Sequence, residues 1–367
     1  MKELSHPSLH RTWVEIDLGA IIANVRYFRE TVSAACQIMP SVMADAYGHG
    51  SVEVSRAALA GGATRLAVAT CREGQTLREA GIGVPIQVLG ASLPEEIETA
   101  VRYNLTLSLQ DLETARLVAV TAMHHGRVAP VQIEIDTGER RLGFLPESAV
   151  AAACEIAGFP GMVFEGAFTR LAEASDRDRS LRQLGEFTRA CHEIEDAGIT
   201  GFMRHAANSA STLLHPESHL DLVRPGCGVL GFLPQTCAGL SSVLRPAMSW
   251  RAAIVLLKDF PSGDAPARRV AVLPVGYADG YQPEFSRRAR VLIRGKRVPV
   301  VDAVSMDYTL VDVTGVDGLT PGTVATLMGE DRGERIGIQE LSAWGEVTPS
   351  ELTVGIGGRV GRQYAAN

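Results

Sequence analysis

The residues best placed for chemistry begin in the stretch 40–50, where an apolar segment runs through a polar glycine turn toward a helix near Ser51. If the chain forms an α/β barrel, strand ends of this kind face the active site. Tyr47 is then a polar site candidate, and we expect His49 to pack or to cap the helix. Met43 is chemically inert, because a thioether neither condenses with an aldehyde nor exchanges a proton.

Two charged residues stand at the ends of predicted neighbouring strands. Glu134 lies near the end of the predicted strand 131–135, and Arg170 follows the predicted strand 162–168. Alternate positions of a strand share a face, so both side chains could point into one barrel mouth. A lone buried cation is costly, and we therefore expect Arg170 to pair with Glu134, directly or through Arg141.

The elements that must position these residues alternate between strand-like and helix-like segments over the first two thirds of the chain. Repeated βα units predict a parallel sheet with right-handed crossovers, and about eight of them close a barrel. The strand-like segments are 12–17, the Met43 stretch, 66–69, 86–89, 106–109, 131–135, 162–168, 202–205 and a last turn at 223–232. Helical spacing is clearest at 18–31, 71–80, 94–103, 111–124, 147–157, 175–197 and near 209.

The pattern changes after Pro234. Short β-rich runs broken by Gly, Pro and Asp turns follow, which is typical of a mostly antiparallel β domain. These runs are 252–257, 269–273, 289–293, 298–301, 308–313 and 324–328. We predict a barrel over 12–238, a β domain over 239–367 and an N-terminal arm over 1–11.

Composition narrows the classes of function. A chain of 367 residues that is 46% hydrophobic can bury two cores, and a formal net charge of −7 without basic clusters argues against nucleic acid as a partner. No segment has the length and apolarity of a membrane span or a signal peptide. The six cysteines are scattered and suggest neither a metal site nor disulfides. We predict a cytoplasmic protein that acts on a small molecule.

Five motifs occur in the order that is found in the alanine racemases, the barrel-type pyridoxal phosphate enzymes. They are PSVMADAYGHG (40–50), HAANS (205–209), VRPG (223–226), VGYADGY (275–281) and SMD (305–307). The chain resembles that family from Trp13 to Tyr364. The resemblance implies an α/β barrel with a β domain, and a head-to-tail homodimer whose sites each take Tyr277 from the other chain.

The resemblance also implies a cofactor site. The lysine that holds the cofactor as an imine in the family falls at Met43. Tyr47 and Ser209 would contact the cofactor phosphate, and Arg224 would face the pyridine nitrogen. Backbone N–H groups of Gly226 and Cys227 would receive the phosphate, since such groups suit an anion.

The catalytic and substrate-binding residues follow from the same resemblance. The family uses two bases on opposite faces of the substrate, the lysine and a tyrosine that matches Tyr277. A tyrosine that acts near neutral pH needs positive charge beside it, which His205 and Arg224 could supply. Arg141 matches an arginine that contacts substrate and cofactor, and the loop of Met306 and Asp307 matches one that helps hold the substrate carboxylate.

Two departures accompany Met43. Arg170 stands where the family usually has a histidine against the cofactor ring, so a fixed cation replaces a flat neutral surface. Glu134 stands where many members carry a lysine that becomes carbamylated. Our predicted catalytic residues are Tyr277, His205 and Arg141, and the predicted substrate-binding residues are Arg170, Glu134, Met306 and Asp307.

Three hypotheses are consistent with these departures. The first is a divergent enzyme, in specialised metabolism, that performs acid–base chemistry on an amino-acid-like or carboxylate substrate without covalently bound pyridoxal phosphate. The second is a pyridoxal phosphate-dependent alanine racemase with an inactivating Lys-to-Met change at position 43. The third is a noncatalytic protein that binds an amino acid or the cofactor. In each of them any pyridoxal phosphate is held noncovalently.

Overall fold

The structure is a computed structural model that describes residues 11–262 and 265–365. It divides into two compact units, one made of the described parts of Met1–Ala20 and Pro246–Asn367, and the other of Ile21–Arg245. The predicted N-terminal arm, apart from residue 11, lies outside the described residues. The predicted boundary at 238 and 239 precedes this division by a few residues.

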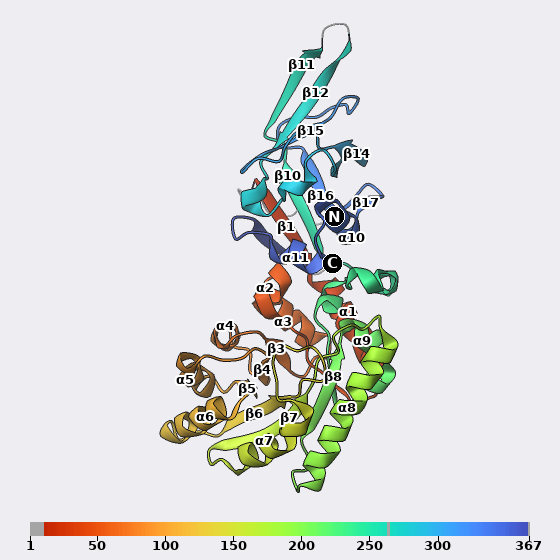
Figure 1. The fold of residues 1–367 in the computed structure, drawn as a ribbon. Coiled ribbons are helices and arrows are strands. Elements are labelled where there is room, and N and C mark those ends of the chain that lie inside the picture. The colour runs from red at the N-terminus through yellow and green to blue at the C-terminus, as the bar shows by residue number, and fades with distance from the viewer. Residues whose placement is uncertain (1–10, 263–264, 366–367) are drawn as a thin grey trace. The chain divides into compact units, whose positions relative to one another are not determined.

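The unit Ile21–Arg245 is built on a sheet of parallel strands in the order β2-β9-β8-β7-β6-β5-β4-β3 (Figure 1). A parallel bridge between Ser41 and Ala67 joins the two ends of this sheet, so the strands form a barrel. The α/β barrel fold predicted from the sequence is confirmed. Its strands are β2 (Gln37–Ile38), β3 (Leu66–Val68), β4 (Ile86–Val88), β5 (Thr106–Leu109), β6 (Ala129–Glu134), β7 (Met162–Phe168), β8 (Met203–Asn208) and β9 (Leu222–Arg224).

Helices connect these strands, and several begin at a side chain that caps the first turn. Thr70, Asp111, Asp176 and Asn208 each accept a hydrogen bond from a backbone N–H of the first turn, which satisfies a donor that the helix leaves free. The helices are α1 (Leu18–Thr31), within which the division falls, α2 (Met43–Gly48), α3 (Ser51–Ala60), α4 (Cys71–Glu79), α5 (Pro94–Arg102), α6 (Leu112–His124), α7 (Pro146–Gly158), α8 (Arg177–Asp196) and α9 (Ser209–Leu214). Three 3₁₀ turns complete the unit: η1 (Pro216–Ser218), η2 (Cys227–Leu230) and η3 (Gln235–Val243).

The second unit is mostly antiparallel, as the sequence predicts. One sheet has the order β14-β13-β16-β10-β1-β18, with β17 paired to β16, and another has the order β11-β12-β15. Its strands are β1 (Thr12–Asp17), β10 (Met248–Ala253), β11 (Leu256–Ser262), β12 (Ala265–Leu273), β13 (Arg290–Ile293), β14 (Lys296–Pro299), β15 (Thr309–Asp312), β16 (Val324–Asp331), β17 (Glu334–Ile336) and β18 (Gly361–Ala365). The helical segments are η4 (Tyr277–Asp279), η5 (Pro283–Phe285), α10 (Ile338–Gly345) and α11 (Pro349–Val354).

Two predictions about strands are wrong. The strand 12–17 forms, but it pairs antiparallel with β10 and parallel with β18 instead of joining the barrel. Alternation of apolar and polar residues within one segment predicts that it forms a strand, but it does not predict which strand it pairs with. The predicted run 252–257 is not one strand either, because its residues end β10 in one sheet and begin β11 in another.

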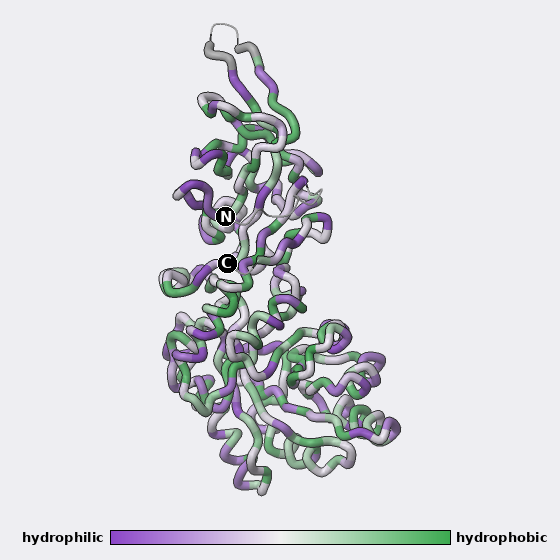
Figure 2. Tube along the Cα trace, turned by 180° about the vertical axis from the view of Figure 1, so that it is seen from behind, coloured by the Kyte–Doolittle hydropathy of each residue, from purple (hydrophilic) through white to green (hydrophobic). Residues whose placement is uncertain are grey.

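Hydrophobic and hydrophilic residues are interspersed along the chain in both units (Figure 2). Among the described residues, no helix combines the length and the apolarity that crossing a membrane requires.

Candidate active site

A pocket of about 240 Å³ lies at the carboxyl ends of the barrel strands, where barrels of this class place their active sites. Leu89 follows β4, Arg170 lies beyond β7, and Arg224 ends β9. Seven of the predicted site residues line this pocket, namely Met43, Tyr47, Arg170, Ser209, Arg224, Gly226 and Cys227. The remaining lining residues are Ser41, Leu89, Glu139, Leu171, Ala206, Asn208, Ala210 and Pro234.

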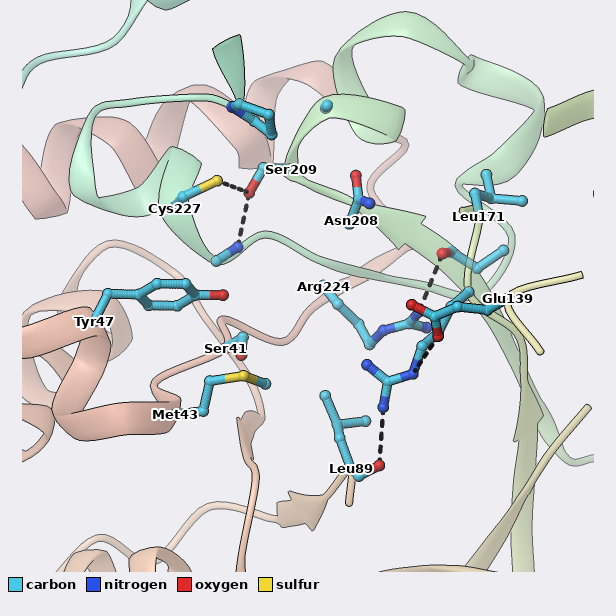
Figure 3. Close-up of a pocket in the computed structure, with 15 residues that line it drawn as sticks. Ser41, Met43, Tyr47, Leu89, Glu139, Leu171, Asn208, Ser209, Arg224 and Cys227 are labelled. Carbon is cyan, nitrogen blue, oxygen red and sulfur yellow. Dashed lines mark hydrogen bonds and ion pairs between the residues drawn. The ribbon is translucent and has the colours of Figure 1, made fainter. Parts of the chain in front are cut away.

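Met43 and Tyr47 reach the pocket from one unusual turn, α2, and project into it together (Figure 3). The residues from Ala44 to Tyr47 all have φ between 50° and 54°, in the left-handed region that side chains rarely adopt. Glu73 stabilises the turn by accepting a hydrogen bond from the Ala44 backbone N–H at 2.7 Å. The sequence predicted an ordinary turn here and missed this conformation. Met43 itself packs against the apolar barrel cluster that includes Leu89 and Phe168.

One end of the pocket is built around the hydroxyl groups of Ser209 and Tyr47. The Ser209 hydroxyl oxygen accepts hydrogen bonds from the backbone N–H groups of Gly226 at 2.8 Å and Gly228 at 3.0 Å. A Cβ atom at Gly226 would lie 2.6 Å from the Tyr47 hydroxyl oxygen, so a larger residue there would force the tyrosine or the turn to shift. Burial raises the pKa of Tyr47 to about 12, and its hydroxyl therefore stays protonated and able to donate near neutral pH.

Arg224 is buried behind the pocket in a network of hydrogen bonds. Its Nη2 donates to the carbonyl oxygens of Thr169 at 2.7 Å and Ala206 at 3.1 Å, and its Nη1 contacts His205 Nδ1. Because a guanidinium only donates, His205 Nδ1 must accept, and Nε2–H then donates to Gln132 Oε1 at 2.6 Å. Burial, and next the Arg170 charge, lower the pKa of Arg224 to about 9, which still leaves it cationic at neutral pH.

His205 does not supply the positive charge that the sequence suggested. Its burial, and next the charge of Arg224, hold the pKa of the imidazole well below its usual range. The neutral His205 ring is held between Gln132 and Arg224, and it orients the Arg224 guanidinium. His205 is also stacked on Phe168, with ring centroids 5.1 Å apart.

The predicted ion pair between Arg170 and Glu134 is present and direct. Arg170 Nε donates to Glu134 Oε1 at 2.8 Å, and the Glu134 side chain is only 2% exposed. Arg170 Nη2 donates to the Leu89 carbonyl oxygen at 2.9 Å, which fixes the plane of the guanidinium. Glu139 Oε2 lies 3.5 Å from Arg170 Nε, so two carboxylates surround this cation.

Arg141 does not take part in that pair. Its side chain is 58% exposed and contacts Glu139, with 3.1 Å between Nη2 and Oε2, and it is not among the residues that line the pocket. The turn before it is shaped by Asp136, whose Oδ1 accepts from the Gly138 and Arg140 backbone N–H groups. The structure therefore does not bring Arg141 into contact with Arg170 or Glu134.

Tyr277, Met306 and Asp307 lie together in the second unit. The backbone N–H of Tyr277 donates to the Ser305 carbonyl at 3.0 Å, and that of Ala278 donates to Met306 at 3.1 Å. The side chains of Tyr277 and Met306 are 46% and 53% exposed within the chain. The two predicted motifs therefore form one exposed local surface of the second unit.

Sequence reasoning missed several residues that support the pocket. Glu139 lines it and contacts both Arg170 and Arg141. Gln132, one of two polar residues in the strand β6, contacts His205. Its alternation with Glu134 along β6 was a usable signal. Glu73 gave no such signal, because its partner Ala44 is distant in the sequence.

Comparison with known proteins identifies the family. The alanine racemase N-terminal domain matches residues 16–234 and the alanine racemase C-terminal domain matches residues 247–364. The chain is 39% identical to an alanine racemase of Methanococcus maripaludis, over 97% of this chain and 99% of that protein. It is also 39% identical to one of Symbiobacterium thermophilum, over 96% and 97%.

Solved structures agree with the sequence comparison. The alanine racemase from D-cycloserine-producing Streptomyces lavendulae superposes with a TM-score of 0.91 at 31% identity, over 98% of both chains. The alanine racemase from Streptomyces coelicolor A3(2) gives a TM-score of 0.90 at 33% identity, over 97% of this chain and 98% of that one. The chain with Met43 in its barrel pocket therefore belongs to the alanine racemase family.

Proposed function

We propose that this protein binds pyridoxal phosphate in its barrel pocket without a covalent bond and racemises alanine slowly or not at all. The family and its relatives' names support the cofactor and the ancestral reaction. Met43 supports noncovalent binding and slow racemisation, because a thioether cannot form an imine with the cofactor or act as a base. No other residue of the barrel unit replaces it, since the lysines of the chain are Lys2, Lys258 and Lys296 and none falls within Ile21–Arg245.

The residues present fit the phosphate end of the cofactor. The Ser209 hydroxyl, whose oxygen accepts from the N–H groups of Gly226 and Gly228, keeps its own hydrogen to donate to a phosphate, and Tyr47 adds a second hydroxyl. The backbone N–H of Cys227, which begins η2 beside the pocket, would be a further donor. Arg224 would lie toward the ring, held in orientation by neutral His205. The aldehyde end finds no amine. Once bound, pyridoxal phosphate supplies an electron sink for bonds at the α-carbon of an amino acid.

The proposed homodimer assigns a role to the second unit. We infer that Tyr277, with Met306 and Asp307, serves the pocket of a partner chain, as the family resemblance implies. Its exposed side chain supports this, because an acid–base tyrosine must reach a substrate outside its own turn. Heterodimers that combine Tyr277→Phe chains with Arg170→Gln chains contain one site with both residues intact. Any activity lost in each homodimer should partly return in the mixture, and no recovery in verified heterodimers would contradict the shared site.

Two measurements test the proposed function. Equilibrium dialysis with pyridoxal phosphate should give saturable binding that is lost on dialysis and is weakened in Ser209→Ala. Alanine racemisation should stay far below the roughly 10 turnovers per second of an ordinary enzyme. Racemisation at that rate, or no saturable binding at all, would contradict the proposal.

A second candidate function is acid–base chemistry on an amino-acid-like or carboxylate substrate with no need of pyridoxal phosphate. The Arg170–Glu134 pair favours it, because this pair introduces a fixed cation into the pocket. In that case Tyr277 would be the acid–base group, and Arg141 with the Met306 loop would hold the carboxylate. Full turnover of such a substrate by protein that has been freed of cofactor would distinguish the two candidates.

A further inference from the structure

Arg170 has hydrogen-bond donors that the protein does not use. Its Nε donates to Glu134 and its Nη2 to Leu89, while Nη1, which carries two N–H groups, finds no acceptor in the described part of the chain. The Arg170 side chain is only 20% exposed, but Nη1 is not one of its buried atoms. Because Arg170 lines the pocket, these two donors are reachable from the pocket.

Arg224 shows how differently a structural arginine is treated in the same pocket. Both of its terminal nitrogens are occupied, Nη1 by His205 and Nη2 by two carbonyl oxygens. Both guanidinium groups lie over the ring of Phe168, at 5.9 Å for Arg170 and 5.3 Å for Arg224. The protein thus uses the donors of Arg224 to build the pocket and leaves Nη1 of Arg170 without a protein acceptor among the described residues.

The unused donors favour an anionic group, and a carboxylate fits best. Glu134 and Leu89 fix the guanidinium plane, so Nη1 needs no further ordering before it binds. A charged acceptor makes a stronger hydrogen bond to a guanidinium than a neutral one does. The slot between this end and the Ser209 end carries the apolar side chains of Met43, Leu89 and Leu171.

We infer that the pocket takes a ligand in which a phosphate, an aromatic ring and an amino acid are already joined, with the carboxylate bound by Arg170 Nη1. A phosphopyridoxyl amino acid is the chemical class. The barrel has no lysine that could form an imine with the free aldehyde. A ligand whose amino-acid nitrogen is already bonded to the pyridoxyl carbon does not need that lysine in order to bind. This inference rests on the proposed function for its phosphate end, and it adds the carboxylate contact.

The test compares two stable probes by isothermal titration calorimetry on the full-length protein. N-(5′-phosphopyridoxyl)-L-alanine carries the carboxylate, and N-(5′-phosphopyridoxyl)ethylamine lacks it but keeps phosphate, ring and nitrogen. We expect the alanine probe to bind about tenfold tighter or more, as a charge-assisted hydrogen bond would give. Ser209→Ala should weaken both probes by a similar factor.

Variants assign the preference to Arg170. The double variant Arg170→Gln with Glu134→Gln removes both charges, so no buried carboxylate is left unpaired, and it should bind the two probes equally. Arg140→Gln, which removes an exposed arginine from the loop before the pocket, should keep the preference.

Each outcome has a distinct meaning. Equal binding of the probes by the unaltered protein overturns the inference and leaves the proposed function standing. A preference that survives the double variant but disappears in Arg141→Gln overturns it as well, because the carboxylate is then held elsewhere. Failure of both probes and of pyridoxal phosphate to bind overturns the proposed function together with the inference.

Discussion

The two ends of the barrel pocket are built from different parts of the chain. The Ser209 end consists of backbone N–H groups at Gly226 and Gly228 and one hydroxyl. The opposite end consists of the side chains of Arg170 and Glu139, and Met43 lies on the apolar wall between the two ends. A site made from the backbone survives most substitutions, whereas a site made from side chains changes its chemistry with a single residue. In this pocket the side-chain part includes Met43, which has no amine, so a substitution there is expected to change the chemistry more than one beside the Ser209 end.

The largest expected effect comes from Met43→Lys, which places an amine among the pocket side chains and leaves the Ser209 end unchanged. Pyridoxal phosphate should then attach covalently, visible as an imine absorption band and as a pyridoxyl group retained after borohydride reduction. Racemase activity should rise about a hundredfold or more, since a positioned general base contributes that much.

The Met43→Lys result also separates the two candidate functions. Activity that appears only after Arg170→His is added would favour the second candidate, because Arg170 would then be what blocks racemisation. Attachment without any activity in either variant would contradict the proposed ancestral reaction.

Arg170→Gln should destabilise the fold by about 3 kcal/mol, because it leaves Glu134 as an unpaired buried carboxylate. Urea denaturation at neutral pH measures this loss. Adding Glu134→Gln should restore most of the stability, since the uncompensated charge is removed. A loss below about 0.5 kcal/mol in Arg170→Gln, in the range of an ordinary surface substitution, would mean that the pair is effectively solvated.

Gly226→Ala tests the backbone end. Its Cβ would lie 2.6 Å from the Tyr47 hydroxyl, so either the tyrosine or the turn must move out of place. We expect affinity for pyridoxal phosphate to fall about tenfold or more, which corresponds to about 1.4 kcal/mol. Gly185→Ala in α8, where a Cβ would meet open space, is the matched control and should bind as the unaltered protein does. Unchanged affinity in Gly226→Ala would exclude this turn from the phosphate site.

His205 makes the stability of the barrel depend on pH. Burial and Arg224 lower its folded-state pKa, so below about pH 6.5 the unfolded chain binds a proton that the folded chain does not. This contribution is therefore complete above pH 6.5 and is lost as pH falls, by up to about 1.4 kcal/mol per pH unit. Urea midpoints between pH 5 and 7.5 should drop less steeply in His205→Gln. Parallel curves would show that His205 can become protonated in place.

The smallest effect is expected for Arg141→Gln. The side chain is largely exposed and its contact with Glu139 is of the surface type, so stability should change by less than about 0.5 kcal/mol. A loss as large as that of Arg170→Gln, measured in the same urea experiment, would mean that Arg141 moves into the pocket in solution.

Local patterns were sufficient for much of the fold and part of the site. Helices such as α5 and α8 could be predicted because their start signals, Pro94 in α5 and Asp176 before α8, and their apolar spacing lie in adjacent residues. The Arg170–Glu134 pair could be predicted because two neighbouring strands place alternate residues on one face. These inferences need only the sequence of one helix or of two consecutive strands.

Features set by distant partners could not be predicted in this way. The left-handed turn 44–47 is made of ordinary residues and is held by Glu73 from α4. The neutral state of His205 depends on burial and on Arg224 from another strand. The place of β1 beside β10 and β18 depends on segments more than 200 residues away.

Mass spectrometry of the unaltered protein, loaded with pyridoxal phosphate and treated with borohydride, tests noncovalent cofactor binding most directly. Under native conditions we predict one cofactor per chain, and after denaturation we predict that Ile21–Arg245 carries no modification while Met43→Lys keeps its pyridoxyl group. Absence of the cofactor under native conditions, or its covalent retention by the unaltered protein to the same extent as by Met43→Lys, would contradict the account.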